Sequence, residues 1–273
     1  MQVDNKKRFG VFIWFGYRIP IQERVLLIKE TGFDTVLHWW DDSFAEIEGL
    51  TKEAQAEQIR KAGLDIENAH LLPDKVNHIW YDTLDGQATF ESYLSDLNGL
   101  AKHNIQVAVL HPSSGVDAPP VSDIGLHRIR ALAERAEQLG VRIALENMRN
   151  THILAHLLDS ISSPALGFCY DSGHDFIWSP APYELLKKYK DRLFAIHLHD
   201  NMGKSDDHLP PGSGLVNWDI VRFEIEDSVY SGAYTLESDS AVVPATRTPK
   251  EHLKLHYDNA VRTFNTSKNQ SIT

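Results

Sequence analysis

The sequence has few of the features that would place a protein in a membrane, outside the cell or on nucleic acid. Cys169 is the single cysteine, so no intrachain disulfide can form and a cytoplasmic location is expected. No apolar run approaches the roughly 18 residues of a membrane span, and the N-terminal residues lack a signal-peptide core. The 38 acidic residues outnumber the 27 basic ones, and the net charge of -11 disfavours nucleic acid as a partner.

The sequence also lacks an interdomain linker and a dinucleotide-binding turn. No Pro-, Ser- or Gly-rich stretch separates two halves, and no glycine-rich turn follows an early strand, so no nucleotide cofactor is expected. Of the 273 residues, 42% are hydrophobic and 24% charged, which is enough for a large core. We predict one domain over residues 1–265 and a polar tail over residues 266–273.

An amphipathic stretch, a Gly or Asn, and a short apolar run follow one another repeatedly along the chain. Gly32, Gly63, Asn104 and Gly140 can take the left-handed backbone that ends a helix, and each precedes an apolar run. Eight strands alternating with eight helices predict a single parallel (β/α)8 TIM barrel, which uses roughly 250 residues as one domain. The predicted strands cover residues 9–15, 33–38, 64–70, 105–111, 141–146, 167–171, 193–197 and 233–237. The predicted helices cover residues 18–31, 50–62, 86–103, 122–139, 151–160, 180–190, 217–230 and 249–265.

The predicted strands end in ionisable residues. In a parallel barrel the C-terminal ends of the strands meet at one face, where the active site lies. Carboxylates packed together there would repel one another unless a divalent cation screened them. Mixed imidazole and carboxylate ligands suit zinc or manganese, with cobalt, magnesium and iron as alternatives. The strand ends supply His70, His111, Glu146, Asp171, His197 and Glu237, and the loops add His174, Asp206 and His208.

Three further residues near strand ends are kept out of the predicted ligand set. His38 and His199 lie near strand ends, and His199 shares a strand face with His197, so it fits a supporting role equally well. Cys169 shares a face with Asp171, but its place inside the barrel favours core packing over ligation.

Four motifs at strand ends resemble a known family. They are Ala144-Leu145-Glu146-Asn147, Asp171-Ser172-Gly173-His174, His197-Leu198-His199-Asp200-Asn201 with the later Asp206-Asp207-His208, and Leu236-Glu237-Ser238. In this order they resemble the xylose isomerase-like barrel superfamily, and within it the sugar phosphate isomerase/epimerase group related to endonuclease IV. The resemblance covers essentially the whole chain.

The resemblance implies a ligand set for one divalent metal, which consists of Glu146, Asp171, His197 and Glu237. It also implies that His174 binds substrate or serves as a further ligand. His70, His111, Asp206 and His208 match further ligands of the three-zinc site of endonuclease IV, so these residues leave the number of metal ions open. The negative charge, and loops without basic DNA-inserting segments, separate this chain from the nuclease.

The resemblance implies a sugar or sugar phosphate isomerase/epimerase, in which Glu146 and Glu237 move a proton through a metal-stabilised enediolate. The alternatives are a dehydratase acting on a sugar acid or inositol derivative, and a zinc phosphodiesterase acting on abasic DNA. A homo-oligomer is left open. Arg149 and Lys204 are weaker candidates for binding a phosphate. Four tryptophans either stack on the substrate or pack against the barrel, namely Trp39, Trp40, Trp80 and Trp178.

Overall fold

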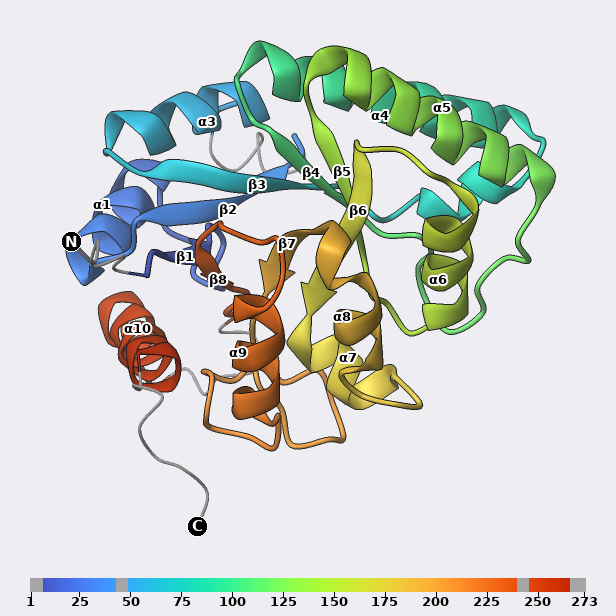
Figure 1. Ribbon diagram of the computed structural model, residues 1–273. Helices are drawn as coiled ribbons and strands as arrows, with labels where there is room; N and C mark the ends of the chain where they lie inside the picture. Colours follow the sequence, from blue (N-terminus) through green and yellow to red (C-terminus); the bar gives the residue numbers. More distant parts are fainter. Residues whose placement is uncertain (1–6, 43–48, 240–245, 266–273) are drawn as a thin grey trace, which may run out of the picture.

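The computed structural model describes residues 7–42, 49–239 and 246–265, and within them eight parallel strands alternate with helices (Figure 1). This confirms the predicted TIM-barrel fold. The strands are β1 (Phe9–Phe12), β2 (Thr35–Trp40), β3 (Asp65–Leu71), β4 (Val107–Leu110), β5 (Arg142–Glu146), β6 (Leu166–Asp171), β7 (Leu193–His197) and β8 (Tyr234–Leu236). Their order in the sheet is β7-β6-β5-β4-β3-β2-β1-β8.

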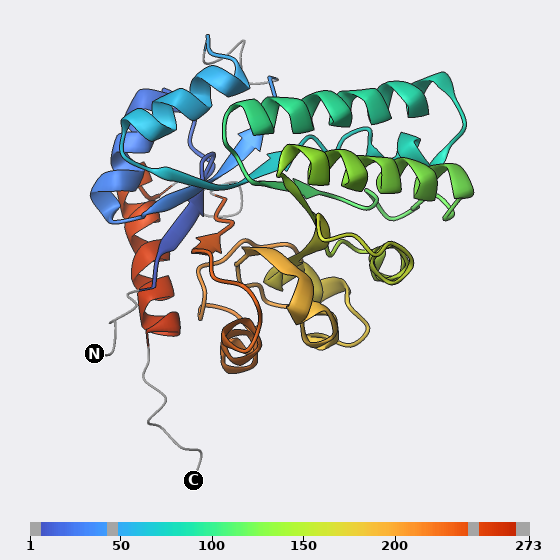
Figure 2. The same ribbon diagram turned by 45° about the horizontal axis from the view of Figure 1, so that its top comes forward.

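The helices form a layer outside the strands, and α4 and α5 lie side by side within it (Figure 2). The α-helices are α1 (Ile21–Thr31), α3 (Lys52–Lys61), α4 (Leu84–Lys102), α5 (Asp123–Leu139), α6 (Thr151–Ser160), α7 (Ser172–Trp178), α8 (Glu184–Tyr189), α9 (Trp218–Glu226) and α10 (Pro249–Phe264). Two 3-10 helices join them, η1 (Val76–Trp80) and η2 (Lys190–Arg192). None of the helices in the described ranges is long and apolar enough to cross a membrane.

Short capping signals in the sequence set the ends of the helices. Gly32 and Gly140 end α1 and α5 with φ angles of 111° and 68°, in the left-handed region where glycine carries no steric penalty. At the other end of α5, the Ser122 side chain accepts a hydrogen bond from the Gly125 N–H. Thr248 and Glu251 form a capping box at the start of α10.

The prediction of one helix over residues 180–190 is wrong in detail. The chain forms α7 directly after β6, then the short α8, then the 3-10 turn η2. Helix α7 can begin there because the Asp171 carboxylate caps it, accepting the His174 N–H at 2.6 Å. Thus His174 lies in the first turn of a helix rather than in a loop.

The interior of the barrel is filled by small side chains, which leaves room for larger polar groups above them. Ala144, Cys169 and Ala195 belong to a compact buried cluster, and Ala144 lies two residues before Glu146 on the same face of β5. Burial raises the pKa of the Cys169 thiol to about 12, so this side chain is neutral near pH 7. Cys169 is therefore a core residue in this structure.

Strands β7 and β8 meet only at the C-terminal end of the barrel. The Leu198 N–H donates to the Thr235 carbonyl at 2.9 Å, and the Glu237 N–H donates to the Leu198 carbonyl at 3.2 Å. The opposite, N-terminal end of the barrel carries a cavity of about 660 Å³, whose lining includes Phe194 of β7 and Tyr230 from the loop before β8. The hydrogen bonds that join β7 and β8 therefore lie at the end of the barrel that carries the ionisable residues.

The contact between η1 and α5 yields a test of the packing. A methyl group on Gly125 would overlap the indole ring of Trp80, which is 1% exposed. We expect Gly125→Ala to lower the free energy of unfolding by about 1–3 kcal/mol, because overpacking displaces the buried ring. Urea unfolding followed by Trp fluorescence measures this. The exposed Arg130→Ala on the same helix is the control and should stay within about 0.5 kcal/mol of wild type.

Candidate active site

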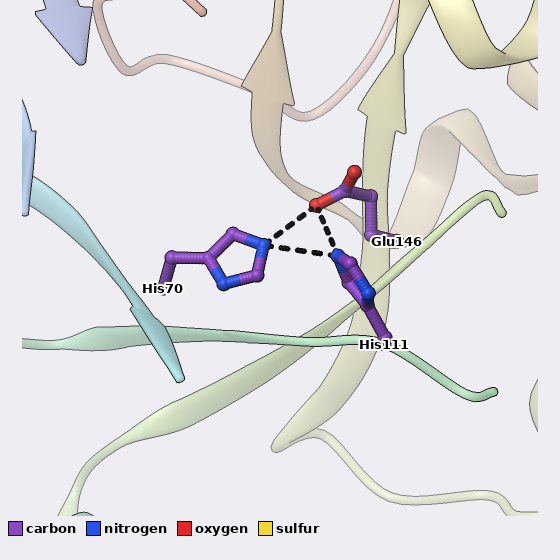
Figure 3. A group of neighbouring side chains, drawn as sticks. All are labelled: His70, His111 and Glu146. Carbon is purple, nitrogen blue, oxygen red and sulfur yellow. Dashed lines mark hydrogen bonds and ion pairs between the residues drawn. The ribbon is translucent and has the colours of Figure 1, made fainter. Parts of the chain in front are cut away.

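The carboxylate of Glu146 lies at the centre of the C-terminal face. His70 from the end of β3 and His111, just after β4, point toward it (Figure 3). The Glu146 Oε2 atom lies 3.3 Å from His70 Nε2 and 3.6 Å from His111 Nε2, and the two imidazole nitrogens lie 3.0 Å apart. Glu146 is 1% exposed, so these contacts replace water around its charge.

The predicted metal ligands come together at this centre. The potential ligand atoms of Glu146, Asp171, His197 and Glu237 all lie within 4.8 Å of one another. His197 Nδ1 lies between the two glutamates, 3.2 Å from an oxygen of each. Asp171 and His197 are fully buried, and the Glu237 side chain is 15% exposed. Four strands therefore bring four ligand-type groups into one small volume.

The remaining predicted residues form a second group beside the first. His174 Nδ1 lies 3.0 Å from Glu146 Oε1, and its Nε2 atom lies 3.2 Å from Asp206 Oδ2. His208 Nε2 lies 3.3 Å from the same Asp206 oxygen, and its ring stacks on His199 with centroids 4.1 Å apart. All nine residues expected at the site therefore lie in one connected cluster.

The charges of the two groups compensate one another. Burial alone would raise the pKa of Glu146 and Glu237, but the facing imidazoles hold both pKa values below their ordinary range. Burial alone would lower the pKa of His174 and His197, but the neighbouring carboxylates raise both well above 6.5. For His208 the same balance gives a pKa of about 9. In the absence of a cation, protons on these imidazoles therefore balance the carboxylates.

Several buried polar atoms in this cluster approach one another as ion pairs, but within the described ranges they lack the alignment of a hydrogen bond. They include both carboxylate oxygens of Glu146, the Nδ1 atoms of His174 and His197, and Glu237 Oε2. Buried polar atoms are nearly always paired, so a convergent set without hydrogen bonds requires an explanation. Oxygen and nitrogen donors arranged in this way fit a divalent cation such as zinc or manganese.

Asp200 fixes the segment that carries Asp206 and His208. Its buried carboxylate accepts five hydrogen bonds, and its backbone pairs with Leu209 through two hydrogen bonds of 2.8 Å. The five donors are the N–H groups of Asn201, Gly212, Gly214 and Val216 and the indole N–H of Trp218, at 2.8–3.0 Å. The Asp200 side chain therefore holds the two ends of the 201–217 segment close together.

Of the two alternatives for the tryptophans, stacking on a substrate or packing against the barrel, Trp40 and Trp80 show the second. Trp40 is 1% exposed and points away from the site toward α4, since neighbouring residues on a strand face opposite sides. Trp80 is equally buried and donates its indole N–H to the Pro112 carbonyl at 2.9 Å. Neither has a free face for a sugar. Trp39 does reach the site, where it stacks on His70 with centroids 5.0 Å apart.

The fourth tryptophan, Trp178, stacks on His174 at 4.5 Å, and the guanidinium of the exposed Arg149 lies 4.8 Å from the centre of its ring. Lys204 is exposed on the 201–217 segment. His38 lies outside the site, with its Nε2 atom 3.0 Å from the Lys52 carbonyl oxygen.

Sequence reasoning left two groups out of this site. His199 Nε2 lies 3.0 Å from Asp171 Oδ1, and its spacing of two from His197 was the available signal. Asn68 is fully buried with its Oδ1 atom 3.4 Å from His197 Nε2. A bulge in β3 changes the alternation there, because Val36 pairs with Ile66 whereas Leu37 pairs with Asn68. No pattern in the sequence marks that bulge.

The family comparison agrees with this architecture. Residues 25–258 match the family described as xylose isomerase-like TIM barrel, and the chain belongs to that family.

Among the solved structures that share the fold are two named proteins. One is described as an IOLI protein with a bound zinc atom; its TM-score is 0.78 at 14% identity, covering 94% of this chain and 98% of that one. The other is a D-psicose 3-epimerase in the presence of D-fructose; its TM-score is 0.72 at 15% identity, covering 95% of this chain and 100% of that one.

Curated relatives include named enzymes and a protein without an assigned function. The uncharacterized protein y4fM of Sinorhizobium fredii is 34% identical over 42% of this chain, which spans only 37% of that protein's length. Fructoselysine 3-epimerase of Escherichia coli O157:H7 is 24% identical over 84% of this chain and 89% of its own length. Inosose dehydratase of Bacillus thuringiensis is 25% identical over 47% of this chain and 49% of its own length.

Asp200 provides a test of how the site is held together. In Asp200→Asn an amide N–H2 would face backbone N–H donors, so buried hydrogen bonds to a charged acceptor would be lost. We expect the free energy of unfolding to fall by about 3 kcal/mol or more, measured by urea denaturation. Asp191→Asn, at an exposed acid outside this segment, is the matched control and should change it by less than about 0.5 kcal/mol. A stability for Asp200→Asn equal to that of the control would contradict this role.

Proposed function

We propose that this protein is a divalent-metal-dependent isomerase or epimerase acting on a sugar or sugar phosphate. The observation that carries the proposal is the pair Glu146 and Glu237, which face each other across His197. One carboxylate oxygen of each glutamate lies 3.2 Å from the same atom, His197 Nδ1. Two carboxylates on either side of a bound carbon chain can remove a proton from one face and return one to the other. The named epimerases among its relatives and structural neighbours support the same reaction class.

Glu146, Asp171, His197 and Glu237 would hold the metal. A divalent cation there supplies Lewis-acid stabilisation of the negative charge that develops when a carbon next to a carbonyl loses its proton. Because the pKa values of Glu146 and Glu237 are held low, both side chains are ionised near neutral pH and can accept a proton. His174 and His208, whose pKa values are raised, would donate hydrogen bonds to substrate hydroxyls or a phosphate.

A dehydratase is the second candidate, favoured by the inosose dehydratase relative. Loss of water next to a carbonyl begins with the same proton abstraction, so the same carboxylates would serve. The wider histidine cluster, with His70 and His111 against Glu146, would also suit a zinc phosphodiesterase. The net charge of -11 weighs against a DNA substrate, since phosphate contacts dominate the affinity of DNA-binding proteins.

Solvent deuterium provides the test of the reaction. Incubated in D2O with Mn2+ and a panel of ketoses and ketose phosphates, the protein should introduce deuterium at a carbon next to the carbonyl, as measured by mass spectrometry. Replacing Glu146 and Glu237 together by Gln should lower the exchange rate by about 10²- to 10⁴-fold or more, because no carboxylate remains to move the proton. The exposed Glu137→Gln is the matched control.

Exchange by the double variant at the wild-type rate would eliminate the acid/base assignment. Loss of water from a keto-inositol without deuterium exchange into ketoses would instead establish the dehydratase. Tight, salt-sensitive binding of duplex DNA would favour the phosphodiesterase.

Metal binding should be coupled to proton release. Because the pKa of His197 is raised well above 6.5, a cation that ligates this imidazole must displace its proton near neutral pH. We expect about one Mn2+ per chain, with an affinity that rises about tenfold per pH unit between pH 6 and 8 for each proton released. Titration calorimetry in buffers of different ionisation enthalpy measures stoichiometry and protons together.

His197→Asn should abolish the binding, whereas His127→Asn, at an exposed histidine on α5, should not change it. Two or three zinc ions per chain would show instead that His70, His111, Asp206 and His208 are ligands as well.

A further inference from the structure

The cavity at the N-terminal end of the barrel lies opposite the proposed metal ligands. Its volume of about 660 Å³ is in the range of small-molecule sites. It lies at the end where β7 and β8 are not paired, since the bridge between these strands joins Leu198 and Leu236 at the other end. The lining is mostly polar, and its charged members are Arg8, Arg60, Asp65, Glu67 and Arg142.

Strand β5 shows that this cavity is separate from the candidate active site. Arg142, Ala144 and Glu146 follow one another at intervals of two residues, so their side chains share one face of the strand. Arg142 lines the cavity, Ala144 belongs to the buried cluster inside the barrel, and Glu146 lies in the active site. Four residues of strand separate Arg142 from Glu146, which corresponds to about 13 Å between their Cα atoms.

Phe194 lies between the buried cluster and the cavity. Its ring packs against the cluster and also lines the cavity. Gly167 of β6 makes room for this ring, because a Cβ atom there would lie 2.5 Å from it. The guanidinium of Arg142 lies 4.8 Å from the centre of the same ring. The position of Arg142 at the cavity is therefore supported by packing.

The two acids of the lining already have partners. The Asp65 carboxylate accepts a hydrogen bond from the Arg8 guanidinium at 2.5 Å. Glu67 Oε1 accepts the N–H of Ala233 at 3.0 Å and lies 3.4 Å from the Tyr230 hydroxyl oxygen. Burial raises the pKa of Glu67, which disfavours its charge. Both acids therefore hold the protein chain in place and offer little to a cation.

The other two arginines of the lining have no acidic partner among the described residues. Arg60 donates a hydrogen bond to the His103 carbonyl oxygen, and Arg142 contacts the Phe194 ring. Both side chains are exposed. In a chain with a net charge of -11, three arginines against two acids in one cavity are a local excess of positive charge. Guanidinium groups bind phosphate oxygens through paired N–H donors.

We propose that this cavity is a second binding site, which takes a small hydrophilic phosphomonoester such as a polyol phosphate. A phosphomonoester carries nearly two negative charges near neutral pH, which matches the two guanidiniums of Arg60 and Arg142. Asn104 and Gln106, which also line the cavity, would supply amide groups to the hydroxyls of the ligand. The site is independent of the proposed reaction, because it shares no residue with the metal ligands or the substrate-binding histidines.

Three probes separate the contributions of the charge and of the polyol. They are D-sorbitol 6-phosphate, inorganic phosphate and D-sorbitol, and none of them contains a carbonyl group on which the proposed reaction could act. Binding to the full-length protein is measured by titration calorimetry. We expect D-sorbitol 6-phosphate to bind most tightly and D-sorbitol most weakly, because the polyol lacks the charge and inorganic phosphate leaves most of the cavity to water.

Variants of the two arginines assign the binding to this cavity. Arg60→Gln and Arg142→Gln should each lower the affinity for D-sorbitol 6-phosphate by about tenfold to a hundredfold, because each removes charged hydrogen bonds to the phosphate. Arg142→Lys should restore part of the affinity, since the charge returns without the planar fork. Arg130→Gln, at an exposed arginine on α5, is the matched control and should bind as the wild type does.

A variant at the opposite end of the barrel separates this site from the candidate active site, where a phosphate is also proposed. His208→Asn should keep the Arg142-dependent binding of D-sorbitol 6-phosphate. Loss of binding in His208→Asn, together with wild-type affinity in Arg60→Gln and Arg142→Gln, would place the phosphate in the active site and overturn the proposal. A wild-type protein that does not bind D-sorbitol 6-phosphate would overturn it as well.

Discussion

The charge of Glu146 is the constraint on which the rest of the site depends. This carboxylate is buried at the centre of the barrel face, and an unpaired charge there would cost several kcal/mol. Four imidazoles approach it instead, at 3.0 Å from His174, 3.2 Å from His197, 3.3 Å from His70 and 3.6 Å from His111. His174 and His197 each reach a second acid, Asp206 and Glu237, whereas His70 Nδ1 lies 2.8 Å from the Leu71 carbonyl oxygen. Removing Glu146, His174 or His197 would therefore leave a neighbouring charge uncompensated.

The fold and the central residues of the site can be predicted from local patterns in the sequence. Glycine at the ends of α1 and α5, alternation along the strands, and ionisable residues at strand ends are local features, and together they indicate a barrel with a polar face. Ala144 and Glu146 illustrate this: one small and one acidic residue, two apart, predict both the packing of the interior and the direction of the carboxylate.

The parts that the sequence leaves open or does not reveal depend on register or on distant partners. Trp39 and Trp40 are adjacent in sequence, yet one stacks on a histidine of the site and the other packs against α4, because a strand turns neighbouring side chains to opposite faces. The Trp80 indole packs against Gly125, about 45 residues later in the sequence, because a glycine has no side chain to occupy that space. Asn68 enters the site through a bulge, and bulges leave no compositional signature.

Because of the hydrogen bonds to Asp200, the β7 side of the barrel rim tolerates less sequence change than the β1 side. On the side of β7, one carboxylate ties residues 201 to 218 into a unit, so an insertion or deletion there would disturb five hydrogen bonds at once. On the side of β1, Arg18 stands exposed and can be exchanged without such a penalty. Changes of ligand preference in a barrel built this way are accordingly least costly on the β1 side, where the surface can vary while the charged centre stays intact.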